Sequence, residues 1–385
     1  MRNTGVKSIG IRLPILKEGD NLKNEVVNAV LNATFLGSKF ENVQDIGTKS
    51  GWKVEEVNEY ALHDKDVIGI TESLVARLQG NYVTVDEIAE WIKTKYNNPK
   101  SIWILNPIYS RNRFSMILKA LARAASERVC ITMPAFDEVC NPCGVNRFTG
   151  VDIENYYFEI IDKEGKNASF FKADYRDVEL PLKNKDSLII YCGLHDYKDA
   201  KEEFCPYDNF ITLADIFNEK CEYGLLGSNK ATEEKLKLFP NGTEAQKLVE
   251  DIQNTILKKT GKKVEVMVYG DGCFKDPVGG IWEFADPVVS PAYTKGLEGR
   301  PNEIKIKAFA DDKYKDLNKS ELTKAIKEEI KSKEDNLVGS MASQGTTPRR
   351  YVDLLGSLMD LTSGSGDKGC PVVLVQNYFK SFADD

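Results

Sequence analysis

Short apolar runs alternate along this chain with longer stretches in which apolar residues recur every three or four positions. The short β-branched runs predict buried strands at residues 8–13, 66–71, 102–105, 129–133, 156–161, 188–191 and 371–375. The longer periodic stretches predict helices at residues 22–31, 84–96, 110–126, 243–260, 320–333 and 348–361. The strand–helix–strand order over residues 102–133 is typical of an α/β unit. The patterning therefore predicts a mixed α/β fold.

One predicted strand ends in an unusual way. The apolar run Val264, Val266, Met267 and Val268 stops at Gly270-Asp271-Gly272. An acid between two glycines at the end of a strand can offer its carboxylate to a ligand, because glycine lets the backbone approach closely. Asp-Gly is also a common pair in plain β-turns. The stretch by itself leaves both interpretations open.

Three other segments combine residue types that bind ligands. Asp152 and Asn155 place a carboxylate and an amide three residues apart, and residues 363–369 form a Gly/Ser loop with many backbone N–H groups. Arg349 and Arg350 follow a predicted helix start, with Thr347 as its N-cap, which suits a phosphate or carboxylate. The plainer interpretations are a connecting loop and surface arginines on a capped helix.

Composition limits the classes of function. The chain has 385 residues, 42% of them hydrophobic, which is enough for a large core in two or three domains or in one fold with insertions. A net charge of −7 and the lack of a long basic run argue against nucleic acid as a partner. No segment of about 18 apolar residues and no signal peptide is present, so we expect a cytoplasmic protein with no membrane partner.

The scarcity of histidine restricts the chemistry. The chain has two histidines and eight cysteines, and Cys140 with Cys143 forms its one C-x-x-C pair, for which zinc binding or redox chemistry stays open. Acid–base catalysis by histidine is disfavoured. A bound metal is expected to be Mg²⁺ or Mn²⁺, held by carboxylate oxygens. The sequence lacks the phosphate-loop, dinucleotide-binding and serine-nucleophile motifs.

The order and spacing of several segments are more specific than any one of them. Across about a third of its length the chain resembles the coenzyme F-420 gamma-glutamyl ligase family. The segments that carry the resemblance are residues 13–22, 66–80, 150–155, 240–271 and 354–375. The resemblance implies an α+β fold of two intertwined subdomains and a homodimer. It also implies a nucleotide-driven ligase with two small-molecule substrates, a carboxylate and an amino acid.

The resemblance also implies roles for individual residues. Asp152 and Asp271 would be metal ligands for Mg²⁺ or Mn²⁺. The residues expected to bind the nucleotide, GTP or ATP, are Leu13, Pro14, Ser73, Arg77, Asn155, Gly364, Ser365, Gly366 and Asp367. The basic residues expected to contact phosphate or carboxylate groups in catalysis are Arg77, Lys275, Arg349 and Arg350.

The chain departs from the family's pattern at several positions in or next to these segments. Arg12 replaces a glycine, Glu72 a small hydroxyl residue, Gly272 a hydroxyl residue, and Ser365 a glutamate or glutamine that binds metal. These changes predict an altered metal shell and leave the carboxylate substrate open. The hypotheses are a ligase for another carboxylate, a genuine deazaflavin ligase, and a non-catalytic nucleotide- or metabolite-binding relative.

The resemblance also predicts domain limits. Residues 1–155 would form an N-terminal nucleotide- and metal-binding part, and residues 239–385 would complete the ligase core. Residues 156–238 and about 282–341 exceed the family's usual spacing, so we interpret them as insertions.

Overall fold

A central segment of the chain, residues 79–242, forms a unit distinct from the rest. In the computed structural model, unit 1 consists of Met1–Leu78 and Thr243–Asp385, and unit 2 consists of Gln79–Gly242. The structure describes residues 5–34, 61–146, 149–194, 197–204, 206–270, 274–275, 282–283, 289–340, 344–345, 349–363 and 367–384. The chain therefore leaves unit 1 after residue 78 and returns to it at residue 243.

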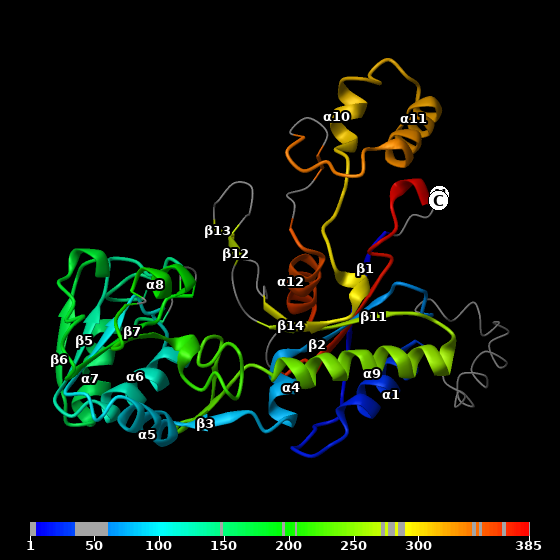
Figure 1. Cartoon of the computed structure of the whole chain (residues 1–385). Coiled ribbons are helices and arrows are strands. Elements are labelled where there is room, and N and C mark those ends of the chain that lie inside the picture. The colour runs from blue at the N-terminus through cyan, green and yellow to red at the C-terminus, as the bar shows by residue number, and fades with distance from the viewer. Residues whose placement is uncertain are drawn as a thin grey trace. The chain divides into compact units, whose positions relative to one another are not determined.

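Unit 1 is built on a five-stranded sheet with the order β1-β15-β2-β11-β14. Its strands are β1 (Lys7–Ile11), β2 (Val67–Thr71), β11 (Glu265–Gly270), β14 (Val289–Tyr293) and β15 (Val372–Gln376). β2 and β11 run parallel, and every other neighbouring pair is antiparallel. β12 (Phe274–Lys275) and β13 (Trp282–Glu283) form a separate antiparallel pair. The N-terminal and C-terminal strands thus lie side by side, as Figure 1 shows.

Helices cover both faces of this sheet (Figure 1). The helices of unit 1 are α1 (Leu22–Ala33), α4 (Glu72–Leu78), α9 (Gly242–Thr260), α10 (Ile306–Asp311), α11 (Lys319–Ser332) and α12 (Tyr351–Ser363). Ile68 and Ile70 of β2 pack in one core with α1 and α9, whereas Val67 packs in a second core with α12. Because successive side chains of a strand point to opposite faces, a sheet covered on both sides needs continuous apolar strands. That requirement explains the unbroken apolar runs in the sequence.

Unit 2 contains a five-stranded sheet whose strands are all parallel, in the order β6-β5-β4-β7-β8. These are β4 (Ser101–Leu105), β5 (Arg128–Thr132), β6 (Asn167–Phe171), β7 (Ser187–Tyr191) and β8 (Phe210–Thr212). The order reverses between β4 and β7, which makes this a doubly wound sheet with a topological switch point. Its helices are α5 (Val85–Lys95), α6 (Arg113–Ala124), α7 (Ile153–Lys163) and α8 (Tyr197–Glu203).

A small antiparallel sheet accompanies the parallel one in unit 2. It has the order β3-β10-β9, with β3 (Tyr82–Thr84), β9 (Asn229–Thr232) and β10 (Lys235–Lys237). β3 leads directly into α5, where Thr84 and Glu87 form the capping box predicted from the sequence. The pairing of β3 with β10 joins the two ends of unit 2, since residues near its start and its end share one sheet.

The mixed α/β class predicted from the sequence is confirmed, with one element assigned wrongly. Residues 156–161, predicted as a strand, lie within helix α7. The buried residues of this helix are Ile153, Tyr157 and Ile161, which recur every four positions, and Asp152 caps its start. The β-branched and aromatic composition of the segment favoured a strand, but the helical spacing and the cap decide its structure.

The limits of unit 2 differ from the insertion limits expected from the sequence. The expected boundary at residues 155/156 falls inside α7, and the expected insertion at residues 156–238 contains β6, β7 and β8 of the parallel sheet. Since β4 lies between β5 and β7, these strands complete a sheet that begins before residue 156. Residues 79–242 therefore contact one another more than they contact the rest of the chain, and they form one unit.

Acid is expected to weaken unit 2 through Asp215. Burial raises the pKa of this carboxyl group, but hydrogen bonds from Lys201 and Thr212 outweigh burial and hold the pKa below its usual range. The carboxylate therefore stabilises the fold above about pH 4, and this contribution is lost as the pH falls further. We expect Asp215→Asn to cost about 1 kcal/mol at neutral pH and to flatten the decline in thermal stability between about pH 5 and pH 3. An unchanged decline would contradict this role.

Candidate functional site

The ends of β1, β2 and β11 and the start of β15 meet at one edge of the sheet in unit 1, which we call the carboxyl edge. Thr71 of β2 lies in register with Tyr269 of β11. Val372, the first residue of β15, is opposite Ile70 and also opposite Ile11, the last residue of β1. The ends of β1, β2 and β11 and the start of β15 are therefore neighbours, although Ile11 and Val372 are 361 residues apart in the sequence (372 − 11).

Several residues predicted from the sequence lie at this edge. Leu13 and Pro14 follow β1, Ser73 is the second residue of α4, and Asp367 is in the segment before β15. Leu13 and Ser73 are half-buried, whereas Pro14 and Asp367 are exposed. These four positions are thus brought to one side of the sheet.

Other predicted residues stand apart or are not described. Arg77 is exposed in the last turn of α4, six residues beyond the end of β2. Asp271, Gly364, Ser365 and Gly366 lie outside the described residues, as does Gly272, and Lys275 is described only as part of β12. Their predicted roles stay predictions. By chain order, residue 271 directly follows β11 and residues 364–366 directly follow α12.

Polar side chains are buried beneath the carboxyl edge. Glu72 is 5% exposed and Tyr269 is 2% exposed, and Ser363 at the end of α12 is also buried. Burial raises the pKa of Tyr269 to about 12; the Ser363 hydroxyl opposes this effect, and the charges of Asp360 and Glu72 reinforce it. The Tyr269 hydroxyl therefore stays protonated at physiological pH, and the negative charges of two carboxyl groups act on it.

Two glycines let neighbouring elements approach this cluster closely. A Cβ at Gly69 would lie 2.1 Å from the Met359 sulfur and 3.0 Å from Tyr269 Cδ1. A Cβ at Gly10 would lie 3.2 Å from the sulfur of Cys370. The absence of a side chain at Gly69 lets α12 pack against β2 and β11, which holds the end of α12 beside Tyr269.

The paired arginines lie at the other end of α12. Arg350 forms two hydrogen bonds, 3.0 and 2.6 Å long, with the Asp353 carboxylate, and Arg349 is half-buried. Tyr351 packs its ring against Tyr378 and Phe379, which follow β15. Since α12 has 13 residues and spans about 20 Å, its first residues lie at the sheet edge opposite the carboxyl edge. The structure does not bring the arginines together with Asp367.

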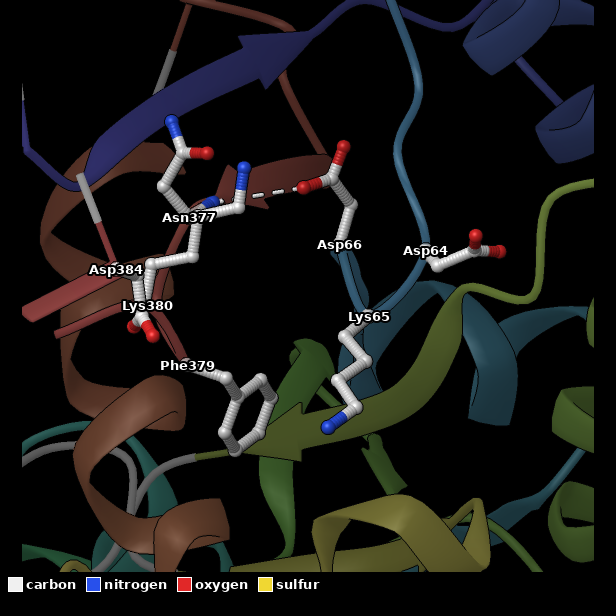
Figure 2. Close-up of a pocket in the computed structure, with 7 residues that line it drawn as sticks. All are labelled: Asp64, Lys65, Asp66, Asn377, Phe379, Lys380 and Asp384. Atoms are coloured by element: carbon white, nitrogen blue, oxygen red, sulfur yellow. Dashed lines mark hydrogen bonds between the residues drawn. The ribbon is translucent and has the colours of Figure 1, made fainter. Parts of the chain in front are cut away.

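A pocket of about 490 Å³ opens at this opposite edge (Figure 2). The residues that line it come from the segment just before β2 and the segment after β15, namely Asp64, Lys65, Asp66, Asn377, Phe379, Lys380 and Asp384. The buried Asp66 carboxylate points toward Asn377, whose backbone N–H donates to it at 3.4 Å, and Asp64 points away. Asp66 also accepts hydrogen bonds from the His63 backbone and the Gln376 side chain. It therefore connects the start of β2 to the end of β15. None of the residues predicted from the sequence lines this pocket.

In unit 2, Asp152 caps helix α7. Its carboxylate accepts a hydrogen bond from the Asn155 backbone at 3.3 Å, and the Asn155 side chain donates to Glu159 at 3.4 Å. Both Asp152 and Asn155 are exposed. This local role accounts for the acid at this position without a ligand. Asp152 and Asn155 belong to unit 2, whereas the other predicted site residues belong to unit 1.

Two substitutions separate capping from metal binding at Asp152. Asparagine caps helices as well as aspartate does, so Asp152→Asn should leave the thermal unfolding of the protein unchanged, whereas Asp152→Ala should cost about 1 kcal/mol. If Asp152 also binds metal, Asp152→Asn should reduce Mn²⁺ affinity at least tenfold in a calorimetric titration. Equal Mn²⁺ affinity in both variants and the wild type would leave capping as its role.

A pocket of about 420 Å³ lies at the carboxyl ends of β5 and β6 in unit 2. An ion pair of 2.9 Å between Lys172 and Glu154 borders it, with Phe136 and Cys143 among its other residues. Cys143 and Cys140 are free thiols, and no described group of three or more His, Cys, Asp or Glu side chains could hold a metal ion. Zinc binding by the C-x-x-C pair therefore finds no second pair of ligands in the described part of the chain.

The loop beside this pocket contains polar residues that the sequence did not single out. Asp137 is buried and accepts hydrogen bonds from the backbones of Tyr109, Val139 and Asn141, and it thereby fixes the loop after β5. Glu138 accepts from the Asn106 side chain at 2.6 Å, at the end of β4. Tyr109 and Asn106 are distant in sequence from these acids. One signal that could have found the acids is their position shortly after a predicted strand.

Comparison with protein families assigns the chain to a class of enzymes. A family model described as F420-0:Gamma-glutamyl ligase matches residues 10–377, which is nearly the whole chain. The model describes ligases that attach glutamate through an amide bond. The chain belongs to this F420-0:gamma-glutamyl ligase family, as its sequence segments had indicated. A search of curated proteins found no match. Among the helices that the structure describes, none is long and apolar enough to cross a membrane.

Proposed function

We propose that the protein is a metal-dependent amide ligase that uses ATP or GTP to join an amino acid, L-glutamate, to a carboxylate substrate through an acyl phosphate. The observation that carries this proposal is the meeting of separate family segments at the carboxyl edge of unit 1. The segments after β1 and β2 and before β15 lie together there, and the family model spans all of them. The proposed enzyme acts as a homodimer in the cytoplasm.

In the proposed reaction, the main task of the protein is to position the nucleotide phosphates and the substrate carboxylate. The γ-phosphoryl group passes to the substrate carboxylate, and the amine of glutamate then displaces phosphate from the acyl phosphate. Phosphoryl transfer relies on positioning and charge stabilisation more than on covalent work by side chains. This suits a chain with two histidines. Leu13, Pro14, Ser73 and the segment that ends at Asp367 are the proposed nucleotide contacts at the carboxyl edge.

The side chains at this edge suit a hard cation. Ser73 and Asp367 offer oxygen atoms, which Mg²⁺ and Mn²⁺ prefer as ligands. Asp271, which directly follows β11 in the sequence, and Asp152 are the proposed metal ligands. A bound Mg²⁺ would neutralise the negative charge of the nucleotide phosphates. The nucleotide contact assigned to Asn155 and the phosphate contacts assigned to Arg77, Lys275, Arg349 and Arg350 also belong to this proposal.

Calorimetry and phosphate release test the proposal. ATP and GTP are titrated into the protein with Mg²⁺ or Mn²⁺, and phosphate release is then measured with L-glutamate and a panel of carboxylates that includes the deazaflavin precursor. We expect binding of at least one nucleotide and release of phosphate that requires both L-glutamate and a carboxylate. The absence of nucleotide binding would refute the ligase.

A second candidate function follows from two substitutions in the sequence. Gly272 stands where the family usually has a hydroxyl residue, and Ser365 where it usually has a glutamate or glutamine that binds metal. These substitutions favour a relative that binds a nucleotide or metabolite without catalysis. In the same experiment this candidate predicts nucleotide binding with no phosphate release for any carboxylate in the panel.

A further inference from the structure

The buried polar cluster at the carboxyl edge has the composition of a site for an organic cation. It combines the Glu72 carboxylate, 5% exposed, with the Tyr269 hydroxyl and the Ser363 hydroxyl. No hydrogen bond of good geometry reaches the Tyr269 hydroxyl from the described residues, although Tyr269 is 2% exposed. A buried hydroxyl without a partner costs about 1–3 kcal/mol. Such a group calls for an explanation, and a ligand that supplies the missing partner provides one.

The backbone fixes the position of this cluster. Thr71, in register with Tyr269, is followed directly by Glu72, which begins α4. Ser363 ends α12, which packs on the same face of the sheet as Tyr269. Three elements therefore converge on one point at the carboxyl edge, where the proposed reaction takes place.

We infer that Glu72 and the Tyr269 hydroxyl bind the ammonium group of the amino-acid substrate. This inference rests on the proposed ligase function. A primary ammonium carries one positive charge and three donors, and here it meets a carboxylate, a phenolic oxygen and the oxygen of Ser363. The Ser363 hydroxyl donates to the Asp360 carbonyl at 3.0 Å, so its oxygen keeps its acceptor capacity.

An ammonium fits these surroundings better than a divalent metal does. Mg²⁺ demands six oxygen ligands in near-octahedral geometry and usually keeps several waters. Tyr269 is packed with Leu355 and Met359 in an apolar core, and these two side chains offer no oxygen ligands to a metal. The second carboxyl group near the hydroxyl, that of Asp360, adds negative potential that attracts a monovalent cation.

Calorimetric titration of L-glutamate tests this assignment, with glutarate as the matched probe that lacks the amino group. Against the full-length wild type we expect L-glutamate to bind. Glu72→Gln should weaken that binding at least tenfold, and Tyr269→Phe should weaken it about threefold. Glutarate should bind the three proteins equally. Asp251→Asn, an exposed acid on α9, serves as the charge-matched control and should leave L-glutamate binding unchanged.

Each outcome decides the inference. Equal L-glutamate affinity in the wild type and in Glu72→Gln would overturn it, as would the absence of L-glutamate binding by the wild type. Loss of Mn²⁺ binding in Glu72→Gln, with L-glutamate binding intact, would also overturn it and make Glu72 a metal ligand. ATP or GTP binding, measured separately, shows whether the proposed function itself has failed. Far-ultraviolet circular dichroism of each variant confirms that the protein is folded.

Discussion

Asp271→Asn is expected to abolish the Mg²⁺-dependent binding of ATP and GTP while leaving thermal unfolding in metal-free buffer nearly unchanged. Asparagine keeps the size of the side chain but removes the charge that a hard cation requires. Asp271 directly follows β11, which ends at the carboxyl edge beside the end of β2. We expect a nucleotide affinity at least a hundredfold weaker in a calorimetric titration with Mg²⁺, and a melting temperature in EDTA within about one degree of the wild type.

The comparison with a second variant makes this result specific. Asp251→Asn removes the same charge from the exposed surface of α9 and should bind nucleotide as the wild type does. A large loss of stability of Asp271→Asn in EDTA would instead support the interpretation of Gly270-Asp271-Gly272 as a structural turn. Unchanged nucleotide affinity would remove Asp271 from the metal site.

Local signals in the sequence predicted most of the elements of unit 1 and the first half of unit 2. The run at residues 264–268 is the core of β11, and the helix predicted at residues 243–260 is α9 to within one residue. The capping box at Thr84 and Glu87 is formed as predicted. Each of these signals depends on a few consecutive residues, such as an unbroken apolar run, helical spacing or a cap, and tertiary contacts need not be known to interpret them.

The sheet of unit 2 shows where such signals fail. β7 pairs with β4, whose partner residues lie 86 positions earlier, and β8 is only three residues long. Polar loops separate these strands, so the local composition of residues 156–238 indicated an insertion. The unit is recognised only when β5 and β6 are placed on one side of β4, and β7 and β8 on the other. Pairing between distant strands decides this order, and local composition carries little information about it.

The candidate site contains some residues that local sequence signals predicted and others that depend on the pairing of distant strands. Family segments pointed to Leu13, Ser73 and Asp367, and the sheet order then explains why they are neighbours: β15 lies between β1 and β2. Glu72 and Tyr269 were not predicted as site residues, because their importance comes from burial at the end of two adjacent strands. Arg349 and Arg350 were grouped with the phosphate site by their charge and their position at a predicted helix start, and the length of α12 separates them from the carboxyl edge.

Gly227→Ala is expected to destabilise unit 2 by about 3–4 kcal/mol, because two costs coincide at this position. Gly227 has φ of +68°, a conformation that costs a residue with a side chain about 1–2 kcal/mol. A Cβ there would lie 1.6 Å from a ring carbon of Phe239, whose side chain is buried and packs against Tyr223 at 5.5 Å between ring centroids. Displacing a packed ring adds about 1–3 kcal/mol.

A second glycine in unit 2 allows the backbone cost to be measured without the packing cost. Gly165 has φ of +71°, and a Cβ there would meet nothing within 4 Å, so Gly165→Ala should show the backbone cost alone, about 1 kcal/mol. In urea unfolding followed by circular dichroism, Gly227→Ala should lower the midpoint well beyond Gly165→Ala. The double variant Gly227→Ala, Phe239→Leu should recover part of the difference, because a smaller side chain removes the ring that the new methyl group would strike. Equal midpoints for the two alanine variants would show that Phe239 moves aside freely and that the packing around Gly227 places no constraint on unit 2.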